Sequence, residues 1–498
     1  MKLQLNFIGL LGARGAKLTL GLATMFAYAR IFGVSATYDA WVWALGLVNA
    51  LSMLLFGPIT ETIRASYASI DQRDGRLAAE QYIATVAVLM IGSAIGVCIV
   101  SMLVLPLAAT QFVPRQSGQG PSATFFLYAL GPSLILSQMV AILTAHLNCR
   151  SRVYAPEVAG ILGGCVGLVF IAVFPRLPAA WLLIGSYYIG LLAPLAVGAS
   201  FWPEVIRALS HLEWPIFRRH AREALIFSLP LLLPYGFGQL GGIVERQYAL
   251  LAGTGALSVL SYAFFARNTV QAVFTAALSA LAVPALARSW DAHNTTPFRT
   301  TLAHWLHQCL MLATVGMIFL FGLANVVPPL LFGKSITADH QILLAQLLRF
   351  YAVAIVAVIL YLLGGSALLA ARRGKTYATL GAAASLASLL LLLLLFPLIG
   401  IAAIPIGVAI SHMLAAMLMF RSIHRAEMWR VLGNAALRIA AILVGGSVVQ
   451  AVGYALPMAS GLMLRTTIMG MAALSIAGAW WLVEHQLGRK AAGPTFAV

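Results

Sequence analysis

The sequence predicts an all-α polytopic membrane protein with about 14 transmembrane helices, arranged as two six-helix lobes plus an extra helix pair. Three observations predict this fold class. The chain is 61% hydrophobic and only 9% charged, whereas soluble domains carry about 25% charged residues. Its apolar residues form runs that can cross a bilayer, which needs about 20 residues per helix. Finally, connections rich in Lys and Arg alternate along the chain with connections that have few. A resemblance between the two halves of the chain predicts the two lobes.

The apolar runs define the expected elements in order. The predicted spans are residues 6–32, 39–63, 82–107, 122–146, 157–175, 179–200, 224–251, 257–285, 302–332, 341–370, 377–396, 400–420, 435–455 and 461–483. Several exceed the length that a bilayer requires, which predicts tilted or kinked helices. No small-residue cleavage site follows the first apolar run, so we expect it to insert as a helix instead of being removed as a signal peptide.

The basic residues predict the orientation of these spans. An even number of helices places both termini on one side. If that side is the cytoplasm, cytoplasmic segments hold 20 Lys and Arg residues and the opposite loops hold 3, namely Arg115, Arg176 and Lys334. This asymmetry fits the positive-inside rule and predicts a multi-pass protein of the bacterial inner membrane with both termini in the cytoplasm. Topology thus accounts for the net charge of +17, and we expect membrane lipids, not nucleic acid, as partners.

An internal repeat divides the chain into two similar parts. The segment 146–155 resembles 369–378, which pairs Arg150 with Arg373 and Tyr154 with Tyr377. The repeat predicts an N-lobe over 1–222, a C-lobe over 223–430, and an extra helix pair with a short tail over 431–498. Parallel repeats of this kind are typical of transporters that bind their substrate between the lobes.

Charged residues inside the predicted spans are the candidate substrate ligands, because charges in a bilayer are costly and usually serve function. We select Arg14, Lys17, Arg246 and Arg267 as cations that face an internal cavity. Arg14 and Lys17 share one face of the first helix. The other basic residues near span ends are expected to extend towards the membrane surface: Arg30, Arg349, Arg438 and Arg465. The cysteines lack metal-ligand spacing, so no metal site is expected.

The seventh span contains the residues expected to form a hinge: Pro230, Pro234, Gly236 and Gly238. Proline and glycine interrupt helices, and interrupted spans mark binding sites in transporters. Farther along this span, Gly242 and Arg246 can share one face, and the adjacent Glu245 is a candidate site for ion or proton coupling. Asp39 is a second candidate for coupling, although a carboxylate at the head of the second span also suits an N-cap.

Three short motifs resemble the MurJ/MviN family of the multidrug/oligosaccharidyl-lipid/polysaccharide exporter superfamily. They are Ala29-Arg-Ile-Phe-Gly33 followed by Asp39-Ala40, Val283-Pro-Ala-Leu286, and Leu331-Phe-Gly-Lys334. The resemblance covers most of the chain. It implies alternating-access flipping of an undecaprenyl-pyrophosphate-linked glycan, either lipid II or a polysaccharide repeat unit. It also implies that proteins of glycan synthesis are further partners.

This chain departs from the family at its arginines. Leu18 and Thr24 stand where the family has arginines in the first helix, and Ser52 and Met53 replace a pair in the second. The family's arginine in the eighth helix falls near Phe265. As a hypothesis, Arg14, Lys17 and Arg267 substitute for these arginines from nearby turns.

Other functions remain as alternatives. One is a drug/cation antiporter of the same superfamily, and another is a scaffold of a synthase complex. A membrane glycan polymerase or ligase would require a large outer loop, and none is predicted. Gly333-Lys334-Ser335 resembles half of a P-loop, but Pro328 replaces its first glycine. We therefore expect no enzyme activity and no cofactor, and an ion gradient or membrane potential as the energy source.

Overall fold

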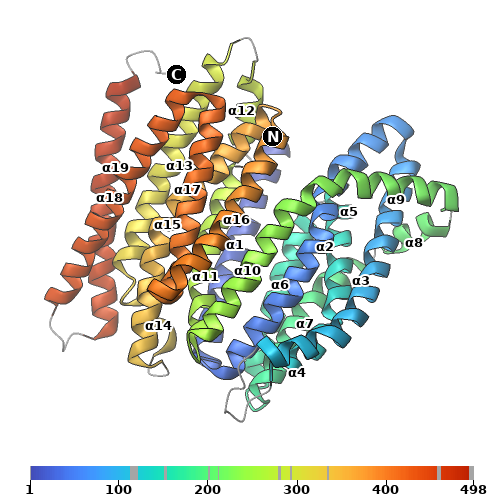
Figure 1. Cartoon of the computed structure of the whole chain (residues 1–498), viewed down its shortest axis with the longest axis horizontal. Helices are drawn as coiled ribbons and strands as arrows, with labels where there is room; N and C mark the ends of the chain where they lie inside the picture. The colour runs from blue at the N-terminus through green and yellow to red at the C-terminus, as the bar shows by residue number, and fades with distance from the viewer. Residues whose placement is uncertain are drawn as a thin grey trace. The chain divides into compact units, whose positions relative to one another are not determined.

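The computed structural model describes residues 2–112, 122–150, 154–199, 202–210, 212–278, 282–291, 294–333, 336–456 and 461–492. Within these ranges the chain forms helices joined by turns and loops, without a strand (Figure 1). The all-α prediction is confirmed. Contacts divide the chain into an amino-terminal unit, Met1–Ser258, and a carboxy-terminal unit, Val259–Val498. The lobes over 1–222 and 223–430 are defined by the repeat and not by contacts, so they stay a prediction.

The amino-terminal unit is built around one long helix, α2. Its helices are α1 (Lys2–Ile31), α2 (Ala36–Asp74), α3 (Arg76–Phe112), α4 (Ala123–Leu130), α5 (Ser133–Cys149), α6 (Tyr154–Val173), α7 (Ala179–Val197), α8 (Trp202–Ser210), α9 (Trp214–Ser228), the 3₁₀ turn η2 (Leu229–Leu231) and α10 (Leu232–Leu251). The central α2 packs against α3, α4, α5 and α10, while α1 packs on α6. The Ser35 side chain caps the start of α2 by accepting a hydrogen bond from the Tyr38 amide at 3.3 Å.

The predicted span over 122–146 is bent. It comprises α4 and α5, whose axes differ by 44° across residues 131 and 132. Pro132 explains the bend, because proline has no amide hydrogen to donate to the preceding turn.

The carboxy-terminal unit is built around α15. Its helices are α11 (Ala256–Ala277, from residue 259 onward), α12 (Val283–Ser289), α13 (Thr296–Gly322), α14 (Val327–Phe332), α15 (Ala338–Ala370), α16 (Gly374–Ile399), the 3₁₀ turn η4 (Gly400–Ala402), α17 (Ala403–Ile423), α18 (Arg425–Ala455) and α19 (Leu462–Ala492). Of the most apolar stretch of α15, 72% is buried inside the protein, compared with 22% for α3. Apolar α3 side chains are therefore left to face lipid, whereas α15 supplies the core.

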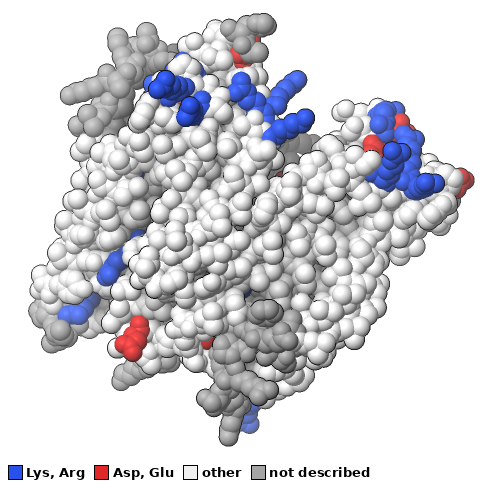
Figure 2. All heavy atoms as spheres, in the orientation of Figure 1, with Lys and Arg blue, Asp and Glu red and all other residues white. Residues whose placement is uncertain are grey.

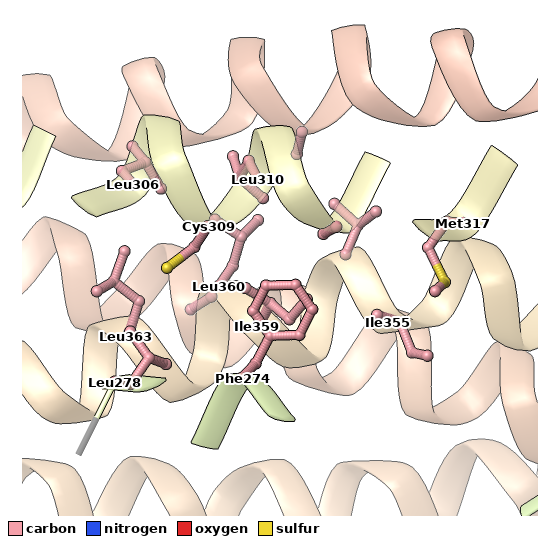
Figure 3. Close-up of a cluster of buried hydrophobic side chains, with 14 of the residues drawn as sticks. Phe274, Leu278, Leu306, Cys309, Leu310, Met317, Ile355, Ile359, Leu360 and Leu363 are labelled. Atoms are coloured by element: carbon pink, nitrogen blue, oxygen red, sulfur yellow. The ribbon is translucent and has the colours of Figure 1, made fainter. Parts of the chain in front are cut away.

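Figure 3 shows how this core is filled. The Phe274 ring of α11 lies between α13 and α15, beside Ile359 of α15. Leu310 of α13 and Leu360 of α15 are fully buried in the same cluster. Such interdigitated packing supplies dispersion contacts that lipid tails cannot match in density.

The structure contains ten helices that are long and apolar enough to cross a membrane, or eleven if the bent α4–α5 pair is one span, within the described residues. One of the ten is the segment Gly374–Ile423, which holds both α16 and α17. These two helices pack against each other, and the chain reverses at Gly400, where φ is +58°. Glycine suits this left-handed conformation because it has no Cβ. The protein is multi-pass, and the count of fourteen stays a prediction.

The internal repeat extends to element boundaries. Tyr154 begins α6, and its repeat partner Tyr377 lies in the first turn of α16. The alignment that pairs Arg150 with Arg373 also pairs Trp202, which begins α8, with Arg425, which begins α18. The first turns of α18 therefore occupy the repeat position of α8, although the extra pair was placed outside the repeat.

Candidate functional site

Arg246 lies in a seam between α10 and α2 of the amino-terminal unit. Its guanidinium Nη1 donates a hydrogen bond to the Gly242 carbonyl at 2.8 Å, which confirms that these two residues share one face. The side chain crosses α2 at Gly46, where a Cβ would overlap it. Nearby, Trp43 Nε1 donates to Gln247 Oε1 at 3.2 Å. The missing Cβ at position 46 thus makes room for a large cationic side chain in the helix interface.

The same seam continues along α2 towards the predicted hinge. A Cβ at Gly57 would overlap the ring of Tyr235 on α10. Positions 46 and 57 are about three helical turns apart, as are positions 235 and 246 on α10. Two glycines of α2 therefore receive two large side chains of an antiparallel neighbour.

The predicted hinge residues lie within one helical span, Trp214–Leu251, at and after a short 3₁₀ turn. The chain passes from α9 through the 3₁₀ turn η2, which contains Pro230, into α10. Pro234, Gly236 and Gly238 all lie in the first two turns of α10. A Cβ at Gly238 would meet open space. The 3₁₀ turn contains Pro230, and the hinge itself stays a prediction.

Lys17 is paired across two helices. Its Nζ lies 3.1 Å from Glu157 Oε2 on α6, and its side chain is 54% exposed. The carboxylate offsets part of the cationic charge expected at this position. Arg14 lies on α1, but its side chain is outside the described residues. The roles of both residues as substrate ligands stay predictions.

Asp39 is fully buried and holds the start of another helix. Its carboxylate accepts hydrogen bonds from the amides of Gly255, at 2.5 Å, and Ser258, at 2.7 Å, and from the Ser258 hydroxyl, at 2.5 Å. Ser35 caps α2 itself, so the N-cap interpretation of Asp39 is wrong for its own helix. Asp39 instead caps α11, where the helix dipole and the first amides favour a negative charge. Its candidate coupling role stays a prediction.

Arg267 lies on α11 in the carboxy-terminal unit, enclosed by aromatic rings. Its guanidinium carbon is 5.5 Å from the ring centroid of Phe264 and 5.7 Å from that of Tyr351. Its Nε is buried and has no hydrogen-bond partner among the described residues. Cation–π contacts with these two rings stabilise the charge of the guanidinium, and its role as a substrate ligand stays a prediction.

Two other polar residues, Ser52 and Arg438, make contacts with side chains of neighbouring helices. Ser52 accepts a hydrogen bond from Gln138 Nε2 at 2.8 Å. Arg438 was expected to extend to the membrane surface, but it is 1% exposed and lies 5.6 Å from the Trp480 ring. The surface prediction for Arg438 is wrong, because α19 covers that face of α18.

From the sequence, the arginines of α9 indicate only which side of the membrane this segment lies on. The structure gathers Arg218, Arg219 and Arg222 with Arg73 of α2 around one groove. Figure 2 shows the blue cluster over the ends of α2 and α9. The spacing of Arg218 and Arg222, four residues apart within a helix, is the signal that could have revealed this shared face.

The sequence-based candidates also do not include one buried carboxylate, Glu427. Glu427 is 1% exposed and lies 3.1 Å from both Arg299 and Arg430. At the equivalent repeat position, Glu204 lies 2.7 Å from Arg150. Each unit therefore has an arginine–glutamate pair at the start of a corresponding helix.

Two comparisons at the sequence level identify the same family. The family described as "Lipid II flippase MurJ" matches residues 28–474. A protein of Burkholderia cenocepacia named lipid II flippase MurJ is 23% identical over 451 residues, which cover 86% of this chain and 85% of that protein.

Solved structures share the fold. A structure titled lipid II flippase MurJ in the inward closed conformation superimposes with a TM-score of 0.74 at 15% identity, covering 97% of this chain and 100% of that one. An inward-facing multidrug resistance MATE family transporter has a TM-score of 0.65 at 14% identity, covering 86% of this chain and 99% of that one. Because the matched family covers most of this sequence, the chain belongs to the lipid II flippase MurJ family.

Proposed function

We propose that this chain flips a polyprenyl-pyrophosphate-linked glycan from the inner to the outer leaflet of the cytoplasmic membrane by alternating access. The family match over residues 28–474 is the observation that carries the proposal. The substrate named in the family description is lipid II. A polysaccharide repeat unit on the same carrier is the second candidate, because Leu18, Thr24, Ser52 and Met53 stand at family arginine positions.

The headgroup of such a substrate is a pyrophosphate, which needs cations. Guanidinium groups bind phosphate oxygens through two parallel hydrogen bonds and stay charged at any physiological pH. Arg267 supports this role because its Nε, buried beside aromatic rings, has no partner among the described residues. Arg246 adds a second guanidinium, already oriented by the Gly242 carbonyl. Lys17 and Arg14 complete the proposed set of ligands.

The proposed cycle uses the interruption between α9 and α10 as its hinge. Pro230 lies in the 3₁₀ turn, and Gly236 and Gly238 follow within two turns. Rotation here would change the angle of α10 and carry Arg246 with it.

Energy would come from an ion gradient or the membrane potential, since the sequence lacks a nucleotide-binding motif. Glu245, next to Arg246, is the proposed site for a coupled cation or proton. The 20-to-3 distribution of basic residues supports an orientation with both termini in the cytoplasm. In this proposal the protein moves its substrate without making or breaking covalent bonds.

Complementation tests the cationic ligands. Arg14→Ala, Lys17→Ala, Arg246→Ala and Arg267→Ala would be expressed singly in cells depleted of their own lipid II flippase. We expect Arg267→Ala to abolish growth, because it removes the guanidinium whose Nε is left to bind a ligand. Arg465→Ala is the control, since Arg465 Nη2 donates to the Leu456 carbonyl at 3.0 Å. Normal growth of all four variants at normal expression would exclude a cationic binding site.

Proteoliposomes distinguish the substrates. The purified protein would be offered lipid II, a polyprenyl-pyrophosphate polysaccharide unit, or ethidium. Movement of either lipid-linked glycan supports the flippase, and the faster one names the substrate. Movement of ethidium alone would establish the antiporter alternative and refute the proposal.

The coupling is tested in the same vesicles. A potassium diffusion potential set with valinomycin, or a pH gradient, would be imposed before substrate is added. In the natural protein the imposed gradient should accelerate flipping. We expect the Glu245→Gln variant to flip the substrate at the basal rate, with no acceleration when the gradient is imposed. Equal acceleration in the variant and the natural protein would remove Glu245 from the coupling proposal.

A further inference from the structure

A groove of about 1060 Å³ lies in the amino-terminal unit and runs along α9. Arg73 of α2 and residues of α9 and η2 form its walls. The α9 and η2 residues that line it are Trp214, Pro215, Arg218, Arg219, Arg222, Glu223, Ile226, Phe227 and Pro230. The groove belongs to one unit, and its described lining includes none of the proposed substrate ligands.

Two of its four arginines are held by acidic neighbours. Asp74 Oδ2 lies 3.0 Å from Arg73 Nη2 and 3.0 Å from Arg219 Nη2. Arg73 also lies 3.5 Å from Glu223. These ion pairs join the end of α2 to α9.

The other two arginines are available. Arg218 and Arg222 are exposed and four residues apart, so they project from the same face of α9. Neither makes an ion pair within the part of the chain that the structure describes. Their guanidinium groups therefore present two adjacent donors for an anion.

The groove changes from cationic to apolar along the helix. Below Arg222, one turn farther along α9, Ile226 is 58% exposed and Phe227 is 53% exposed. At the opposite end, Trp214 is 71% exposed and stacks on Phe217 with ring centroids 5.4 Å apart. Tryptophan beside basic residues, followed by exposed apolar residues, is the pattern of a helix that crosses the membrane interface.

We propose that this groove binds an acidic phospholipid. Arg218 and Arg222 would hold the phosphate, and Ile226, Phe227 and Pro230 would contact the first part of an acyl chain. A soluble anion would use the arginines but leave the apolar half of the groove empty. A lipid satisfies both halves, since its charge and its hydrocarbon are joined in the same order as along α9.

The consequence of binding goes beyond the proposed transport. The occupied groove would hold the arginine-bearing first half of α9 at the headgroup level, about two helical turns before the 3₁₀ turn that contains Pro230. The acidic lipid would then act as a fixed support next to the predicted hinge.

Native mass spectrometry of the full-length protein tests the site. The protein in detergent would be mixed with equal amounts of phosphatidylglycerol and phosphatidylcholine. We expect retention of phosphatidylglycerol to fall about 25-fold in the double variant Arg218→Gln with Arg222→Gln, because each basic residue near an anionic lipid contributes about a factor of five. Arg421→Gln with Arg425→Gln removes the same charge outside the groove and should retain the lipid. Equal retention by both double variants would overturn the proposal.

One further variant and two competition measurements identify the ligand. Phe227→Ala should weaken retention, whereas excess inorganic phosphate should leave it unchanged. Displacement by phosphate would reveal a free-anion site, and displacement by an equal amount of lipid II would reveal a substrate site. Either result overturns the phospholipid proposal. Failure of transport changes none of these readouts.

A charge-preserving pair covers the case in which the glutamine variant misfolds. Arg218→Lys with Arg222→Lys keeps both charges but loses the paired hydrogen bonds of guanidinium. We expect intermediate retention, and undiminished retention would refute phosphate binding by the guanidinium groups.

Discussion

At the scale of single residues, the main result concerns Asp39. Its carboxylate accepts three hydrogen bonds from Gly255 and Ser258, although a long stretch of sequence with many helices separates it from them. The sequence predicts that a carboxylate here suits a helix N-terminus, but the helix that it caps is α11 and not α2. The correct partner lies in the α10–α11 connection, so the residue ties the head of α2 to the segment that follows α10.

We expect Asp39→Asn to destabilise the protein. The amide nitrogen would face a backbone donor in place of an acceptor, and the interaction with the helix dipole would be lost. The cost is about 1–3 kcal/mol for an unsatisfied buried group. Thermal unfolding in detergent measures it. Asp339→Asn is the control, because Asp339 is an exposed first-turn residue of α15. If both variants melt at the same temperature, the cap does not contribute to stability.

At the scale of elements, glycines decide how α2 meets α10. Gly46 and Gly57 leave room for Arg246 and Tyr235, and any Cβ would overlap these side chains. Close approach of helix backbones through small residues is a general mode of packing in membranes. The seam therefore positions a proposed substrate ligand and the region after the hinge together.

We expect Gly57→Ala to destabilise the seam by about 1–3 kcal/mol, the usual cost of overpacking. The Tyr235 ring would have to leave its place, since the overlapping atoms belong to the rigid ring. Gly92→Ala on α3 is the matched control, because a Cβ there meets open space. Melting temperatures in detergent compare the two. A loss confined to Gly57→Ala supports the seam, whereas equal melting points contradict it.

The interruption at Pro230 yields a prediction about motion. Pro230→Ala restores an amide donor and should favour one continuous helix through residues 229–231. We expect higher thermal stability but slower flipping in proteoliposomes. Pro194→Ala is the control, since Pro194 also lies inside a helix, α7, away from this interruption. Unchanged flipping in Pro230→Ala would exclude a hinge at this position.

At the scale of the whole molecule, the proposed orientation rests on the distribution of charge. The loop between α6 and α7 contains Arg176, one of only 3 basic residues assigned to the outer side, whereas α9 carries the cluster assigned to the cytoplasm. The same logic applies across the full length, because each added helix reverses the side of the next connection.

Cysteine labelling checks this orientation. In a chain in which Cys98, Cys149, Cys165 and Cys309 are replaced by Ala, a single Arg176→Cys should react with an impermeant maleimide in intact cells. Arg218→Cys should react only after the membrane is opened. Both positions are exposed, so access depends on the side of the membrane. Labelling of residue 218 in intact cells would invert the proposed topology.

The sequence by itself determined the all-α membrane class and the repeat, and it placed Pro230 where the structure has a 3₁₀ turn. These depend on composition and local pattern, since hydropathy adds along a segment and proline acts on its own turn. The tertiary structure alone decided the partners: Asp39 with Gly255 and Ser258, and Lys17 with Glu157. It also decided the burial of Arg438 and the groove between α2 and α9. Partners depend on which distant segments pack together, and a helix face that could meet lipid or another helix looks equally apolar in the sequence.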